Sequence, residues 1–198
     1  MKHFKTLFLI LVSVQMTAHA QTLEEAEKHY YDFSNNRLYG DNQSVIQAGE
    51  KLLPVLDKLH PQRQVFFSFY LGNAYEQEGQ AEKALPLYLK VIEAQPDYHV
   101  VHRAVGYIYL MESNEMAVKV NASEDPAERK KLVEAYQDIL AKALPHLEKD
   151  YACDPYEGTL ESINRIMASL GERAKPGEFK QRIEKLAENC VTILEDKF

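Results

Sequence analysis

Apolar side chains recur three and four positions apart along most of the chain, which is the spacing of one face of an α-helix. The clearest stretches predict helices over about 42–59, over about 156–170 with Gly171 at the end, and over about 177–194. No stretch alternates apolar and polar residues between turn residues, as a half-buried strand would. The pattern therefore predicts an all-α protein.

Capping residues indicate where helices begin. Asp125-Pro126-x-Glu128 and Asp154-Pro155-x-Glu157 each supply a capping carboxylate, a proline in the first turn and an acid near the positive end of the helix dipole. Thr22-x-x-Glu25 is a capping box that predicts another helix start. The polar stretch 113–125 predicts a loop, and Pro145, inside the helix that follows, predicts a kink.

One segment carries a specific spacing: Leu-Gly-x-x-Tyr, then Ala-x-x-x-aromatic, then Pro. Its residues are Leu71, Gly72, Tyr75, Ala84, Tyr88 and Pro96. The first half of the pattern returns 34 residues on, and the second half returns after a further insertion of about 25 residues. These matching residues are Val105, Gly106, Tyr109, Ala143, Leu147 and Pro155. The segment resembles a tetratricopeptide repeat, although Ser68 and His102 stand where that signature has tryptophan.

The resemblance implies a right-handed α-solenoid of about four helix pairs, one of them carrying a long helical insertion over 113–140. Residues 21–198 would form this single domain. The clear repeats are expected at about 65–98 and 99–155, with degenerate helix pairs at 22–60 and 156–196 on either side. Terminal repeats are normally atypical because one of their faces meets water.

Repeats of this family bind proteins on the concave face formed by their first helices. Carried over by position, the resemblance places there Phe66, Phe69, Asn73, Glu76, Arg103, Tyr107 and Leu110. Aromatic residues and arginine dominate binding hot spots, but Phe66 and Phe69 could instead pack against the N-terminal helix pair. One subclass of the family clamps a C-terminal carboxylate with lysine and asparagine. Asn73 matches the asparagine, but Phe69 occupies the lysine position, which argues against that clamp.

The first 20 residues have the form of a secretory signal peptide. Lys2 and Lys5 precede a short apolar run, and Ala18-His19-Ala20 is a small-x-small cleavage site, so cleavage is expected after Ala20. The expected location is the bacterial periplasm or, second, outside the cell. The chain's net charge is −7, and without Lys2 and Lys5 it is −9. An acidic chain argues against nucleic acid as a partner, and the apolar run is too short for stable membrane insertion.

The two cysteines, Cys153 and Cys190, lie 37 positions apart, close to one repeat length. An oxidising compartment permits a disulfide between them, and two buried thiols are the alternative. The histidines His99 and His102 are expected to face solvent near a helix start, and His146 is expected to stand alone. No third ligand accompanies His99 and His102, so no metal is expected.

Enzyme signatures are missing: the sequence has no phosphate-cradling glycine loop, no Gly-x-Ser-x-Gly and no His-Glu-x-x-His. We therefore expect neither catalysis nor a cofactor. The expected function is an adaptor that binds a protein or peptide. The alternatives are a self-associating structural subunit, which would be a homo-oligomer, and a small-ligand module closed by the insertion.

Overall fold

The computed structural model describes residues 23–194; the expected signal peptide, its cleavage site and Thr22 lie outside the described residues. The described residues form helices that are joined by turns and short irregular segments. One isolated β-bridge pairs Tyr98 with Val191. No helix within 23–194 has the length and apolar character that crossing a membrane requires. The chain forms two compact units, and the boundary between Leu87 and Tyr88 lies within one helix. We describe each unit by itself.

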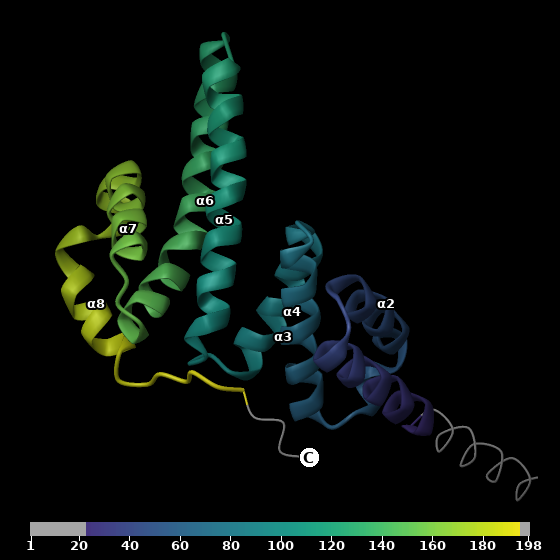
Figure 1. Cartoon of the computed structure of the whole chain (residues 1–198). Coiled ribbons are helices and arrows are strands. Elements are labelled where there is room, and N and C mark those ends of the chain that lie inside the picture. Colours follow the sequence, from purple (N-terminus) through teal and green to yellow (C-terminus); the bar gives the residue numbers. More distant parts are fainter. Residues whose placement is uncertain (1–22, 195–198) are drawn as a thin grey trace, which may run out of the picture. The chain divides into compact units, whose positions relative to one another are not determined.

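Unit 1 is built from antiparallel helix pairs (Figure 1). Its elements are a helix over 23–39, α2 (Asn42–Leu52), α3 (Pro61–Gln77) and the first half of α4 (Ala81–Ala94). The sequence predicted one helix over 42–59, but the α-helix ends at Leu52 and a 3-10 helix, Leu53–Lys58, follows. Pro54 explains the difference, because it has no N–H and its ring clashes with the carbonyl four residues earlier.

The core of unit 1 includes Phe33 and Phe67, which are fully buried with ring centroids 4.7 Å apart. Helices α2 and α3 approach closely at Gly49. A Cβ atom there would lie 2.6 Å from a methyl carbon of Leu71, so only glycine leaves room for this side chain. Leu71, Gly72 and Tyr75 of the repeat-like pattern are all buried.

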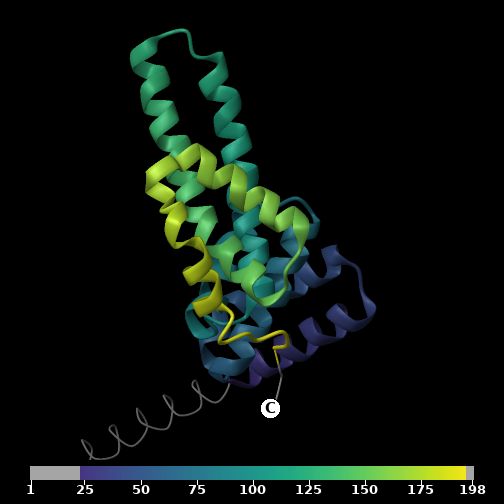
Figure 2. The ribbon, with the colours of Figure 1, turned by 90° about the vertical axis from the view of Figure 1, so that its left-hand side faces the viewer.

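Unit 2 is dominated by a long antiparallel hairpin of α5 and α6, whose distal ends extend beyond α7 in both views (Figures 1 and 2). Its elements are the second half of α4, α5 (His99–Ala122), α6 (Pro126–Cys153), α7 (Glu157–Leu170), two short 3-10 helices (Gly171–Ala174 and Pro176–Glu178) and α8 (Phe179–Leu186). Its core lies between α6 and α7. It contains Leu140, Ala143, Leu144, Leu147, Ile163, Ile166, Leu170 and Ala174.

The insertion differs from the sequence expectation. The predicted loop over 113–125 is helical as far as Ala122, so the insertion lengthens both helices of the pair and not only the second. The charged residues and asparagines of this stretch are exposed, and the residues that are buried or partly buried follow helical spacing. They are Ser113, Met116, Ala117 and Val120. The predicted start of α6 is confirmed, because the Asp125 carboxylate caps the Ala127 N–H at 2.9 Å.

Glycine has the expected role at the base of this hairpin. A Cβ atom on Gly106 would lie 2.6 Å from a methyl carbon of Leu147 and 3.3 Å from its backbone nitrogen. Val105, Ala143 and Leu147, also part of the repeat-like pattern, are completely buried around this contact.

The C-terminal end of the chain departs most from the sequence expectation. The helix predicted over 177–194 ends at Leu186, and residues 187–194 form an irregular segment that we call the strap. The end of α7 is as predicted, with Gly171 at φ 56° after Leu170. The helical spacing of apolar residues continues through the strap. Hydrogen bonds and a disulfide to the rest of unit 2, described below, hold the strap's backbone in a non-helical conformation.

Candidate functional site

Three consecutive charged residues of α6 are buried in unit 2. Glu148, Lys149 and Asp150 have exposed fractions of 3%, 4% and 0%. A buried charge is costly unless it is paired and hydrogen-bonded. Each of the three therefore requires its own partners, and all of those partners come from other segments of the chain.

The carboxylate of Asp150 binds two residues of α5. The Nε atom of Arg103 lies 3.1 Å from both carboxylate oxygens, and Nδ1 of His99 lies 3.3 Å from one of them. Arg103 also donates to Asp154 at 2.5 Å. The hydrogen bond to Asp150 raises the pKa of Arg103 further above its ordinary value. Arg103, expected to face a partner, is thus held by the carboxylates of its own unit.

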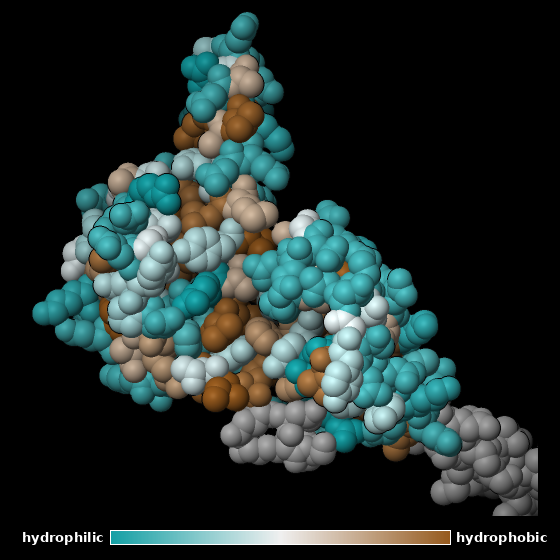
Figure 3. Space-filling view, in the orientation of Figure 1, coloured by the Kyte–Doolittle hydropathy of each residue, from teal (hydrophilic) through white to brown (hydrophobic). Residues whose placement is uncertain are grey.

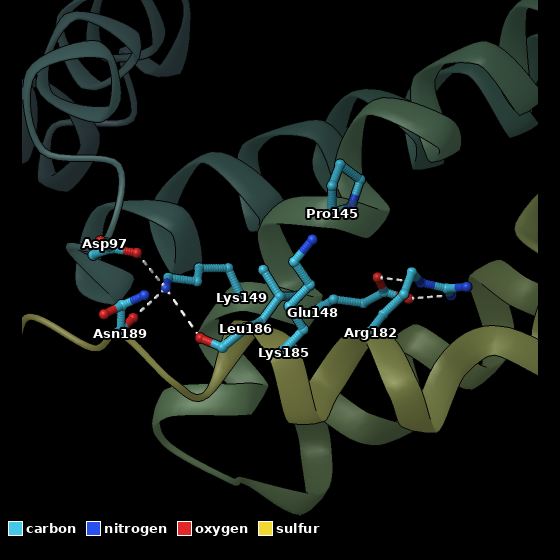
Figure 4. A pocket seen from close by; sticks show the side chains of 8 residues that line it. All are labelled: Asp97, Pro145, Glu148, Lys149, Arg182, Lys185, Leu186 and Asn189. Atoms are coloured by element: carbon cyan, nitrogen blue, oxygen red, sulfur yellow. Dashed lines mark hydrogen bonds and ion pairs between the residues drawn. The ribbon is translucent and has the colours of Figure 1, made fainter.

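Lys149 is bound by three acceptors. Its ammonium donates to the Asp97 carboxylate at 2.8 Å, to the Leu186 carbonyl at 3.1 Å and to the Asn189 carbonyl (Figure 4). Three acceptors match the three donors of an ammonium group. Because two of the acceptors are backbone carbonyls at the end of α8 and in the strap, Lys149 fixes the point where helix α8 ends.

Glu148 binds Arg182 of α8 through two parallel hydrogen bonds, of 2.9 Å and 2.6 Å. This bidentate geometry is the strong form of an arginine–carboxylate pair. Glu148 raises the pKa of Arg182, and a further bond from Arg182 to the Lys175 carbonyl measures 2.9 Å.

A disulfide holds the strap. Cys153, at the end of α6, is bonded to Cys190, with their Cα atoms 5.6 Å apart. The neighbouring Val191 pairs with the segment before α5: its N–H donates to the Asp97 carbonyl at 2.8 Å, and its carbonyl accepts from the His99 N–H at 3.3 Å. The disulfide that the sequence left open is therefore present, although Cys190 lies in the irregular strap and not on a helix.

A pocket of about 350 Å³ opens between α6 and α8 (Figure 4). Pro145 and Leu186 give it apolar walls, and the Glu148–Arg182 and Lys149–Asp97 pairs line it with charge. Arg182 and Lys149 already bind carboxylates of the protein. The pocket therefore offers a small ligand apolar surface, and these two cations are already paired. Lys185 adds a third cation to the lining.

The expectation for the histidines was wrong. His99 and His102 are buried, with exposed fractions of 4% and 9%, and His146 contacts His102 with 3.0 Å between their Nδ1 atoms. His102 Nε2 lies 3.0 Å from the Pro96 carbonyl and must donate to it, so its Nδ1 accepts the His146 proton. Desolvation lowers the pKa of His102 and of His146. The pKa of His146 falls to about 4, because the neighbouring His102 adds to the effect of desolvation.

These histidines do not form part of a larger ligand cluster. Within residues 23–194, no group of three or more histidine, cysteine or acidic side chains is arranged to hold a metal ion.

The expected binding residues of unit 1 lie on α3. Phe66 is 6% exposed and packs against the tilted ring of Tyr70, with 4.5 Å between ring centroids, so it belongs to the core and offers no open surface. Phe69 is partly exposed and also touches Tyr70. Asn73 accepts a hydrogen bond from Gln77 at 2.7 Å. Glu76, also on α3, is partly exposed.

The expected binding residues of unit 2 lie on α5 and are engaged within their own unit. Tyr107 and Leu110 are partly buried against the core between α6 and α7. The Tyr107 hydroxyl lies 3.4 Å from the hydroxyl of Thr159. Together with the ion-paired Arg103, these residues stabilise unit 2, which leaves only parts of them accessible.

The distal part of the hairpin is largely hydrophilic, with isolated hydrophobic residues (Figure 3). Met111 and Val118 are exposed there, at 53% and 68%, but the loop and the first turns of α6 are polar. Scattered exposed apolar residues are normal on a protein surface and do not define a docking face.

Sequence reasoning missed a cluster in unit 1 formed by Arg37 and the aromatic residues of α3. The guanidinium carbon lies 4.5 Å from the ring centroid of Tyr70 and 5.1 Å from that of Phe66. A signal was present, because Arg37 continues the apolar spacing of Ala26, Tyr30 and Phe33 in its helix. A cation at that position requires aromatic or acidic partners.

The fold class supported by this geometry is an all-helical protein made of antiparallel helix pairs. None of the known protein families, curated proteins or solved structures with which the chain was compared matches it.

Proposed function

We propose that the chain is a tetratricopeptide-repeat-like module that binds another protein or a peptide. The observation that carries the proposal is the burial of most of the repeat-like residues within helix pairs, although Pro96 and Pro155 are exposed outside the helices. Gly106 meets Leu147 where the pattern requires close approach, and Leu71, Tyr88 and Ala143 are buried at their matching positions. A solenoid of such pairs presents an extended face, which is the usual binding surface of repeat proteins.

The bacterial periplasm is the proposed location. The signal-peptide pattern at residues 1–20 supports it, and the Cys153–Cys190 disulfide is consistent with it, because disulfides persist in oxidising compartments. The proposed binding of a protein or peptide involves no cofactor and no metal.

The experiment is site-specific photo-crosslinking in the cell envelope, with the photoreactive residue at Phe69. The matched control carries it at Lys180 of α8, whose side chain is 89% exposed. Capture of one heterologous protein at Phe69 and not at Lys180 supports the adaptor. Capture of the chain itself alone would favour a self-associating subunit, and equal capture at both positions, or none, would overturn the proposal.

A second candidate, a small-ligand module, is favoured by the pocket between α6 and α8. Its volume of about 350 Å³ lies at the lower end of the range for ligand sites. Native mass spectrometry of protein purified from its own cells tests this candidate. A retained small molecule that is lost after Leu186→Trp supports it, and a bare mass before and after the substitution argues against it.

A further inference from the structure

Arg37 lies on the inward face of its helix in unit 1. Ala26, Tyr30 and Phe33 precede it at intervals of three and four residues, and all three are buried. Arg37 takes the next position of this stripe and is partly buried, so its side chain lies where an apolar residue would ordinarily pack.

The guanidinium of Arg37 lies over two aromatic rings and has no acidic partner in the described part of the chain. It lies over Tyr70 at 4.5 Å and over Phe66 at 5.1 Å, and its Nε atom is buried without a hydrogen-bond partner. Among residues 23–194, no carboxylate pairs with it.

The other arginines of the described chain behave differently. Arg63 shares two of these features, since it lies 5.0 Å from the ring centroid of Tyr30 and its Nε atom is buried like that of Arg37, but it forms an ion pair with Glu27. The remaining arginines each donate to a carboxylate, a carbonyl or a hydroxyl. They are Arg103, Arg129, Arg165, Arg173 and Arg182.

An arginine is always charged and carries five N–H donors in a planar fork that matches a carboxylate. Aromatic rings attract the cation through their faces but accept none of these hydrogen bonds at full strength. The rings also fix the plane of the guanidinium, which reduces the entropy lost when a carboxylate binds its edge. The arrangement is therefore ordered in advance for a bidentate acid.

We propose that Arg37, held on the ring of Tyr70, binds a carboxylate carried by a partner peptide. The carboxylate belongs either to an Asp or Glu side chain or to a C-terminus. This inference rests on the proposed function and names the chemistry of one anchor point.

The test uses the full mature chain and an immobilised library of hexapeptides with amidated C-termini. Each peptide containing one Asp or Glu is matched by the same peptide with Asn or Gln. We expect the acidic members to retain the protein at least about tenfold more strongly, the effect of one charged bidentate contact. A further set of peptides contains Asn or Gln in place of every acid and has a free C-terminus. This set distinguishes a C-terminal carboxylate from an Asp or Glu side chain, and a preference for either carboxylate supports the site.

Arg37→Met keeps the apolar stem and removes the charge, and it should abolish the acid preference. Arg173→Met removes an arginine of unit 2 already paired with Asp138 and should leave the preference unchanged. If Arg37→Met fails to fold by circular dichroism, Arg37→Lys replaces it, and the loss of bidentate geometry should then reduce the preference. No acid preference in the wild type, or the same preference after loss of Arg37, overturns the proposal.

This outcome is independent of the crosslinking at Phe69. A captured partner without an acid preference would reject the Arg37 site and leave the adaptor standing. An Arg37-dependent acid preference without a captured partner would support the Arg37 site and count against a partner that binds at Phe69.

Discussion

Removing the disulfide should destabilise unit 2 because the bond closes a long loop. Cys153 and Cys190 are 37 positions apart, and the chain-entropy model gives about 4 kcal/mol at 25 °C for a loop of that length. For a chain of this size, each kcal/mol shifts the melting temperature by roughly 2–4 °C. The expected fall in Tm is therefore roughly 8–16 °C.

The measurement is urea unfolding followed by circular dichroism, with the wild type and the Cys153→Ser/Cys190→Ser double variant compared. Adding a reducing agent should bring the wild type to the stability of the double variant. The double variant itself should not respond to the reducing agent, which makes it the control. The slope of the transition with urea should rise somewhat, since the unfolded chain without the cross-link is less compact and exposes more surface.

A second readout follows the strap itself. Lys149 is 4% exposed and gives its three donors to Asp97 and to the Leu186 and Asn189 carbonyls. We expect an amine-reactive reagent to label Lys149 slowly while the disulfide is intact and faster in the double-serine variant, as read by mass spectrometry. The reasoning is refuted if the double variant loses less than about 1 kcal/mol, or if Lys149 is labelled equally in both proteins.

Three further predictions concern unit 2 and are measured by urea unfolding. Gly106→Ala should cost about 1–3 kcal/mol because the new Cβ meets the α6 backbone and a core side chain, whereas Gly177→Ala, with open space, should change stability by less than about 0.5 kcal/mol. Asp150→Asn should cost about 1–3 kcal/mol because it weakens the charged hydrogen bonds that the fully buried carboxylate accepts from Arg103 and His99, while the exposed Asp154→Asn should cost less than about 1 kcal/mol; equal losses would contradict this. The pKa of His146 is lowered from 6.5 to about 4, so above pH 6.5 no penalty exists. As the pH falls toward 4, His146 binds a proton in the unfolded chain but not in the folded chain. The free energy of unfolding should therefore drop by up to roughly 3 kcal/mol. His146→Phe should reduce this drop, and an unchanged pH dependence would show that His146 does not cause it.

Local signals explain which parts of the fold could be predicted. Asp125 and Pro126 mark the start of α6, and Gly171 marks the end of α7, because capping and a positive φ depend on residues within one turn. The loop expected over 113–125 was wrong for a related reason. Polar residues on a two-helix hairpin occupy its wide exposed surface, so polarity there does not distinguish helix from loop.

The candidate site was less predictable. Consecutive charges such as Glu148, Lys149 and Asp150 ordinarily indicate a solvated helix face. Their burial depends on partners such as Arg182, Asp97 and Arg103, which are 34, 52 and 47 positions away. No local pattern specifies pairs at such separations.

By itself, the sequence determined the helical class, several helix ends and the small residues that permit close packing, because these follow from backbone geometry and apolar spacing within a few residues. Only the tertiary structure decided where α8 ends, which charges are buried and which arginine lies over the rings of Tyr70 and Phe66. Lys149 binds one carbonyl at the end of α8 and one in the strap, whose own periodicity was helical, and the Cys153–Cys190 bond secures the strap. Burial in a shared core changes the free energy of a charge by more than local propensity can offset, so these features required the folded chain.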